Sequence, residues 1–150
     1  LAGQRTETVA FAAGRIMLNR LHELAQAQAD FAFESTLSSK SFHPFLLRLK
    51  AHGYHVAIYY FALSSSRLAQ RRVKHRVALG GHDVPADVIK RRFGRSLQNF
   101  FQLYAGVADE WMVFDNSSGH TAQTVAHLTN GQQTIEDTAL WRKLQTLARN

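Results

Sequence analysis

The stretch from Tyr54 to Leu63 reads Tyr-His-Val-Ala-Ile-Tyr-Tyr-Phe-Ala-Leu and is apolar almost throughout. β-Branched and aromatic side chains favour a strand, and a nearly continuous apolar run is typical of a strand covered on both faces. Gly53 stands directly before this run, where the glycine that ends a helix belongs, and the serines from Ser64 to Ser66 directly after it can cap a following helix. The stretch therefore predicts a buried strand flanked by helices.

Further strands and helices alternate on both sides of this stretch. Short apolar runs predict strands at Phe31–Phe33 and Trp111–Phe114, and a weaker one at Thr124–Leu128 that is followed by an Asn130-Gly131 turn. Helical spacing of apolar residues predicts helices over about 6–28, 42–49, 66–79 and 86–104, and a last helix opened by Thr134 and Asp137. This alternation implies crossover connections, and we expect one α/β domain over residues 1–150 with a parallel sheet.

The composition excludes several classes of protein. The chain has 150 residues and no cysteine, so neither a disulfide framework nor a cysteine-based zinc site can form. The eight histidines show no metal-ligand spacing, and we expect no protein-bound metal site. No run approaches the roughly 18 consecutive apolar residues of a membrane span. We therefore expect a cytoplasmic protein without a membrane partner.

The positive charge is concentrated in one segment. The stretch between Arg67 and Arg95 holds nine basic residues and two acids, which equals the net charge of +7 for the whole chain. Such a segment is expected to meet an anion. The backbone of a nucleic acid and the polyphosphate of a nucleotide are both candidates, and charge alone does not choose between them.

Polar residues follow two of the expected strands. Glu34 and Thr36 come after Phe31–Phe33, and a polar loop from Asp115 to Ser118 follows the strand at Trp111. Ligands bind outside the carboxyl ends of the strands in parallel sheets, so we expect the two clusters to converge on one site. The alternative is that Glu34 and Thr36 only shape a capped turn.

The basic segment predicts a helical lid over about residues 66–104. Arg72 and Arg76 are four residues apart and share one face of the first helix, while Arg91 and Arg92 lie early in the second. Gly80-Gly81 separates the two helices and would act as a hinge. The alternative is a solvated basic surface without a ligand.

Taken in order, several motifs resemble the zeta-toxin-like P-loop kinases of bacteria. The most specific is the Gly-Gly-His-x-Val-Pro stretch that is followed by paired arginines. The matching motifs are Ala13-Gly14-Arg15 with Met17-Leu18, Glu34-Ser35-Thr36-Leu37-Ser38, Arg76-Val77, Gly80-Gly81-His82 with Val84-Pro85, Ile89 with Arg91-Arg92-Phe93, Asn99-Phe100-Phe101 and Phe114-Asp115-Asn116-Ser117.

This resemblance implies phosphoryl transfer from ATP, with Mg²⁺, to a hydroxyl group. In the best-known members the acceptor is the amino sugar of UDP-N-acetylglucosamine, and an antitoxin protein is an implied partner. The resemblance also implies roles for eight residues: Glu34 and Thr36 in substrate binding, Arg76 with Arg91 or Arg92 on the transferring phosphate, and Asp115, Asn116 and Ser117 in nucleotide binding.

The sequence departs from the family pattern in one respect. Family members carry a Gly-x-x-x-x-Gly-Lys-Ser/Thr loop and a nearby aspartate that acts as general base, but this sequence contains no Gly-Lys dipeptide. We therefore expect a fragment of a longer protein or a truncated gene product, whose first strand and P-loop would be encoded upstream. Without that loop the 150 residues are not expected to bind ATP as the family does. The alternatives are a nucleic-acid-binding module that uses residues 67–95, which we rank well below, and a non-catalytic remnant.

Overall fold

The computed structural model describes the backbone of residues 2–119 and 121–149 and the side chains of residues 13–119 and 121–149. The chain divides into two compact units, Leu1–Glu34 and Ser35–Asn150. Whether they act as the single domain expected from the length stays a prediction.

The first unit consists of helix α1 (Ala2–Gln26) and an irregular segment that follows it. This helix confirms the prediction that was made from the apolar periodicity of the sequence. The expected strand at Phe31–Phe33 is wrong, because these residues belong to no strand. A strand is defined by a ladder of backbone hydrogen bonds to a neighbouring strand, and a short apolar run does not by itself create such a ladder.

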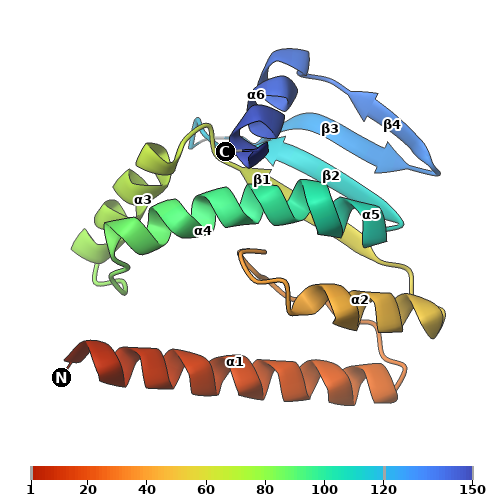
Figure 1. The fold of residues 1–150 in the computed structure, drawn as a ribbon, viewed down its shortest axis with the longest axis horizontal. Helices are drawn as coiled ribbons and strands as arrows, with labels where there is room; N and C mark the ends of the chain where they lie inside the picture. Colours follow the sequence, from red (N-terminus) through yellow and green to blue (C-terminus); the bar gives the residue numbers. More distant parts are fainter. Residues whose placement is uncertain (1, 120, 150) are drawn as a thin grey trace. The chain divides into compact units, whose positions relative to one another are not determined.

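The second unit contains a sheet of four strands in the order β1 (Ala57–Ala62), β2 (Glu110–Asp115), β3 (Gln123–Thr129) and β4 (Gln132–Ile135) (Figure 1). The strands β1 and β2 are parallel, with Ala57 opposite Glu110 and Ala62 opposite Asp115, which confirms the expected crossover between them.

The expectation of a parallel sheet is wrong for the other two strand pairs, which are antiparallel. Residues 116–122 connect β2 to β3, and this link is shorter than the dozen or so residues that a parallel crossover needs. Asn130 and Gly131 join β3 to β4 with φ angles of 52° and 74°, a conformation that is typical of tight hairpin turns. The sheet is therefore mixed.

Helices of the second unit follow the predicted positions closely. Their bounds are α2 (Phe42–Ala51), α3 (Ser66–Ala78), α4 (Ala86–Asn99), the π-helix η1 (Phe100–Tyr104), α5 (Ala105–Val107) and α6 (Thr138–Arg149). Two of the predicted caps are confirmed, but the predicted capping role of Thr134 is wrong, because Thr134 lies in β4 opposite His127. Ser65 Oγ accepts a hydrogen bond from the Leu68 amide at 3.3 Å, and Asp137 Oδ1 accepts one from the Leu140 amide at 2.9 Å. None of the helices in the described ranges has the length and apolarity required to cross a bilayer.

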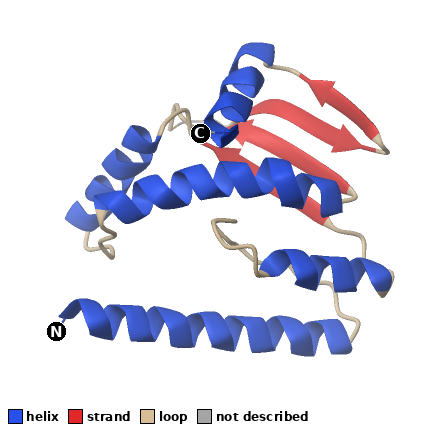
Figure 2. Cartoon of the chain, viewed as in Figure 1, coloured by secondary structure: helices blue, strands red, loops and turns tan. Residues whose placement is uncertain are grey.

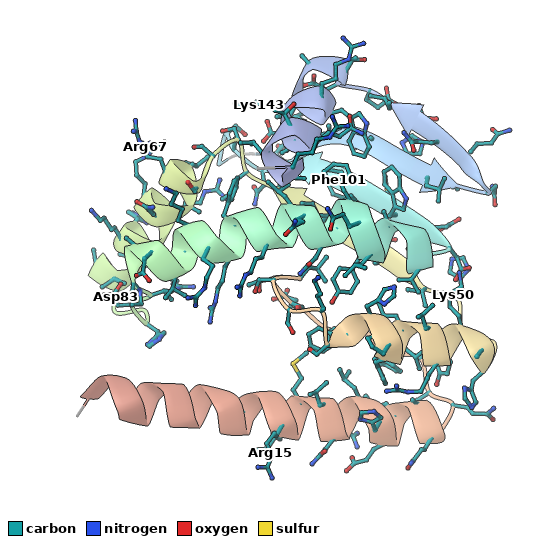
Figure 3. All side chains as sticks on the ribbon, in the orientation of Figure 1. Arg15, Lys50, Arg67, Asp83, Phe101 and Lys143 are labelled. Carbon is teal, nitrogen blue, oxygen red and sulfur yellow. The ribbon has the colours of Figure 1, made fainter. Side chains whose placement is uncertain are left out.

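The core lies between one face of the sheet and the helices α4, η1 and α6 (Figure 2). Trp111 of β2 stacks on Trp141 of α6 with ring centroids 5.5 Å apart. Phe101, labelled in Figure 3, meets Trp141 edge-on at 5.0 Å. Tyr60 of β1 stacks on Phe100 at 4.7 Å, and burial raises the pKa of Tyr60 to about 12. These aromatic contacts fix the long helix against the parallel strands.

The opposite face of β1 is more open than its apolar sequence predicts. Tyr59 and Phe61 are 63% and 57% exposed, whereas Ala62 is buried. The expectation of a strand covered on both faces is therefore wrong. Aromatic side chains of neighbouring strands shield one another there, since Phe61 stacks on Phe114 at 5.1 Å.

An ion pair lies at the opposite end of the two parallel strands, just before β1 and β2 begin. Asp109, just before β2, accepts a hydrogen bond from the Val56 amide at 2.7 Å and pairs with Lys50 at 2.8 Å. The bond to Lys50 and the Val56 amide together hold the pKa of Asp109 below its ordinary value.

Candidate functional site

The carboxyl ends of β1 and β2 are tied together by the loop that follows β2. The Asn116 amide donates to the carbonyl of Ala62 at 2.9 Å, and Ser117 Oγ accepts from the Ser64 amide at 2.9 Å. The loop therefore lies beside the start of α3, at the strand edge where ligands of α/β sheets bind.

The three residues that were predicted to bind a nucleotide, Asp115, Asn116 and Ser117, shape this loop. Asp115 Oδ1 accepts a hydrogen bond from the Ser117 amide at 2.9 Å. The guanidinium of Arg72, on α3, donates to the carbonyl of Asn116. Their contact with a nucleotide base stays a prediction. The sequence left open whether the face that Arg72 shares with Arg76 meets a phosphate or is a solvated basic surface, and in the structure Arg72 contacts this loop.

Arg76 is braced by the turn at the end of α3. Its carbonyl accepts from the Gly81 amide at 2.9 Å, and its Nη2 donates to the carbonyl of His82 at 3.1 Å. A Cβ atom at Gly81 would lie 2.6 Å from Arg76 Cγ and 2.9 Å from the Arg76 carbonyl oxygen. Only glycine fits there. Gly81 therefore makes a specific close contact with Arg76, in addition to any role of the Gly-Gly pair as a hinge.

The helices α3 and α4 form a hairpin that carries the other predicted arginines. Arg91 and Arg92 are exposed on α4, and within the described ranges neither makes a hydrogen bond or an ion pair. Asp83 lies in the turn of the hairpin (Figure 3) and accepts a hydrogen bond from the Val84 amide at 2.8 Å. The guanidinium groups of Arg91 and Arg92 are therefore free to bind an anion in their planar, forked geometry.

Thr36 lies in a loop rich in hydroxyl groups at the start of the second unit. Its Oγ1 is 2.8 Å from Ser38 Oγ, so the two hydroxyls share a hydrogen bond. The side-chain amide of Asn99 donates to the carbonyl of Leu37 at 2.8 Å, and the Tyr104 hydroxyl donates to the carbonyl of Ser39 at 2.5 Å. Asn99 and Tyr104 were not predicted as site residues. The available signal was Asn99-Phe100-Phe101, one of the motifs that carry the family resemblance.

Glu34 is exposed at the end of the first unit, whereas Thr36 and Asp115 belong to the second. The convergence of Glu34 with the loop after β2 therefore stays a prediction.

A fit to ATP and Mg²⁺ can be judged from the groups that the structure describes. Arg76, Arg91 and Arg92 offer donors that suit phosphate oxygens. In contrast, the described side chains form no group of three or more histidine and acidic residues that could hold a metal ion. We therefore assign no residue to Mg²⁺.

A mixed sheet packed against helices, with an arginine-bearing hairpin that starts at the carboxyl end of β1, is consistent with a kinase-like α/β domain. The chain belongs to the Zeta toxin family, whose family model matches residues 3–132.

An uncharacterized protein of Haemophilus influenzae is similar to part of the chain. The two are 31% identical over 81 residues, which cover 54% of this chain and 58% of the relative. The chain thus spans little more than half the length of the curated relative that it matches. No solved structure matches the chain.

Proposed function

We propose that the complete protein transfers a phosphoryl group from ATP to a hydroxyl of a small or nucleotide-sugar substrate. The observation that carries the proposal is the α3–α4 hairpin of a Zeta toxin family chain, which combines a braced Arg76 with Arg91 and Arg92, two arginines that make no ion pair with the described side chains. Phosphoryl transfer depends on positioning and on cationic stabilisation of the transferring group. In the proposal, Arg76, Arg91 and Arg92 supply that stabilisation.

The proposal also assigns residues to each of the two substrates. The loop Asp115–Ser117 contacts the nucleotide, while Glu34 and Thr36 contact the acceptor, for which UDP-N-acetylglucosamine is the candidate. The 150 residues contain no Gly-Lys dipeptide, so the proposal concerns a protein that carries a phosphate-binding loop in addition. Mg²⁺ bound with ATP would neutralise charge on the β- and γ-phosphates.

The cellular setting belongs to the same proposal. The enzyme would act in the cytoplasm, where ATP and nucleotide sugars are available, and an antitoxin protein would restrain it. The first statement follows from the proposed activity, and the second from the resemblance to zeta toxins. A nucleic-acid interface is not favoured, because the matched family is associated with kinase-like function.

The test compares two arginines of the same helix in the complete protein. Arg76→Ala removes the braced guanidinium, whereas Arg67→Ala removes an exposed one near the start of α3 (Figure 3). We expect Arg76→Ala to lower kcat by about a thousandfold or more with little change in the acceptor KM, because a clamp on the transferring group acts in the transition state. Arg67→Ala should retain activity.

The same two variants also test the alternative function, nucleic-acid binding. If the hairpin binds nucleic acid, both variants should weaken binding about equally across sequences and reduce the salt slope by about one unit. Unchanged turnover in Arg76→Ala together with a reduced salt slope would overturn the proposed kinase. Unfolding curves of both variants establish that each one is folded.

A further inference from the structure

The end of the long α4 helix contains a π-helical turn, η1 (Phe100–Tyr104). The Ala105 amide donates to the carbonyl of Phe100, a bond that spans five residues instead of four. In an α-helix, residues five apart point about 140° away from one another. In a turn closed at five residues they lie one above the other. The π turn therefore brings Asn99 and Tyr104 to the same side of the helix.

Both residues use this shared side to hold one loop. Asn99 is 2% exposed and Tyr104 is fully buried, and they donate to the carbonyls of Leu37 and Ser39. The two acceptors are two residues apart in the loop, and the two donors are five apart in the helix. An uninterrupted α-helix would direct one of the donors elsewhere.

The loop that they hold has an unfavourable backbone. Leu37 has a φ of 52°, in the left-handed region that residues with a Cβ atom rarely adopt. Ser35 Oγ supports this shape by accepting a hydrogen bond from the Leu37 amide at 3.1 Å. Such a conformation persists only where the surroundings enforce it, and it often marks a functional site. Here the enforced shape places the Thr36 and Ser38 hydroxyls 2.8 Å apart.

A pair of touching hydroxyls has a defined recognition chemistry. One hydroxyl donates to the other, so the pair retains one hydrogen and several lone pairs for a ligand. This combination suits a ligand group that both donates and accepts, as sugar hydroxyls do. A fully ionised phosphate only accepts, so it would use the one hydrogen and offer no donor to the lone pairs.

We propose that Asn99 and Tyr104 are positioning residues that hold Thr36 and Ser38 as a paired hydroxyl site for a sugar-like acceptor. This inference rests on the proposed function and adds Ser38 to the acceptor contacts. Because η1 continues directly from α4, the same helix carries Arg92 and, about 10 Å further along its axis, Asn99. Arg91 and Arg92 therefore share one continuous helix with the two residues that hold the acceptor loop, while Arg76 lies on α3.

The test uses Tyr104→Phe in the complete protein, because this variant keeps the buried ring and loses only the hydroxyl. The matched control is Ser96→Ala, which removes a hydrogen bond between α4 and Tyr60 (2.9 Å); the described hydrogen bonds of the loop do not involve Ser96. With UDP-N-acetylglucosamine as the acceptor, we expect Tyr104→Phe to raise the acceptor KM about tenfold, the effect of one lost hydrogen bond. The ATP KM should stay unchanged, and Ser96→Ala should match the wild type in both constants.

Two further measurements separate positioning from a merely structural role. Amide hydrogen exchange should become faster in residues 37–41 of Tyr104→Phe and remain unchanged there in Ser96→Ala. Ser38→Ala should raise the acceptor KM without changing exchange in the loop. An acceptor KM that stays constant in Tyr104→Phe, or ATP and acceptor KM values that rise together, would overturn the inference.

Calorimetric titration of UDP-N-acetylglucosamine distinguishes this inference from the proposed kinase. If the wild type binds the sugar nucleotide without turnover, and Tyr104→Phe weakens binding while Ser96→Ala does not, then the kinase proposal fails and the positioning role stands. If turnover is present but neither binding nor KM responds, the positioning role alone fails. Absence of both binding and turnover overturns both.

Discussion

Replacing Gly81 with alanine gives a sharp test of the way in which α3 ends. The added Cβ would lie 2.6 Å from Arg76 Cγ and 2.9 Å from the Arg76 carbonyl oxygen. Carbon atoms in optimal contact are about 3.5–4.0 Å apart, so both contacts are severe overlaps. Rotation of the Arg76 side chain relieves the first overlap but not the second, because the oxygen belongs to the backbone. We therefore expect Gly81→Ala to destabilise the protein by about 1–3 kcal/mol, the usual cost of overpacking.

Gly94 provides the matched control. It lies in the interior of α4, and a Cβ added there meets no atom within 4 Å. Gly94→Ala should stabilise the protein by about 0.5–1 kcal/mol, because glycine in a helix interior loses more backbone entropy on folding. The two alanine variants should thus differ by about 1.5–4 kcal/mol in the free energy of unfolding.

Urea unfolding at 25 °C measures this difference, provided that the slopes of the transitions agree. Turnover of Gly81→Ala reports on Arg76 at the same time, since a displaced turn moves the braced guanidinium. A Gly81→Ala variant as stable as the wild type would refute the account of the turn. In that case the Gly-Gly pair would need another explanation, such as the hinge motion suggested by the sequence.

Three further substitutions test other parts of the second unit. Arg72→Ala removes the charged donor to the Asn116 carbonyl and should cost about 1.5–3 kcal/mol, with faster amide exchange in residues 116–119 as the second readout. Trp141→Ala removes the ring stacked on Trp111 and should cost about 3–5 kcal/mol in urea unfolding, and a loss below 1 kcal/mol would contradict the aromatic core. The lowered pKa of Asp109 means that its contribution to stability is complete above its ordinary pKa of 3.8 and is lost as the pH falls through the lower folded-state value. Unfolding measured between about pH 2 and 7 should therefore show a weaker acid dependence in Asp109→Asn, and equal dependence would count against the ion pair.

Local signals along the sequence were sufficient for most of the individual elements. Apolar periodicity placed the helices, the run at Tyr54–Leu63 placed β1, and the Asn130-Gly131 pair placed the turn before β4. Such features depend on residues that are near one another in the chain, so a short window contains their physical cause. The motifs around Gly80-Gly81 likewise identified the family that the comparison with known proteins then showed.

The arrangement of the sheet needed more than these local signals. The length of the link between β2 and β3 decides their antiparallel pairing, and an apolar run such as Phe31–Phe33 becomes a strand only if a distant segment forms a ladder with it. Similarly, the exposure of Tyr59 and Phe61 depends on which face of the sheet the helices cover. A β-branched or aromatic residue has the same propensity on either face, so its sequence neighbours cannot reveal its burial.

The candidate site shows the same division between sequence and tertiary structure. The sequence by itself determined which residues carry charge and hydroxyl groups, because the chemistry of a side chain is fixed by its identity. Only the tertiary structure decided that Arg72 meets the loop after β2, that Arg76 packs on Gly81, and that Asn99 and Tyr104 hold the loop at Leu37. Arg72 is 44 residues from its partner Asn116, and the contacts of Asn99 and Tyr104 with the loop span 62 and 65 residues of the chain. They come together because burial of the aromatic core fixes the helices on the sheet, and a single extra residue in the turn at η1 then sets which side chains face the loop.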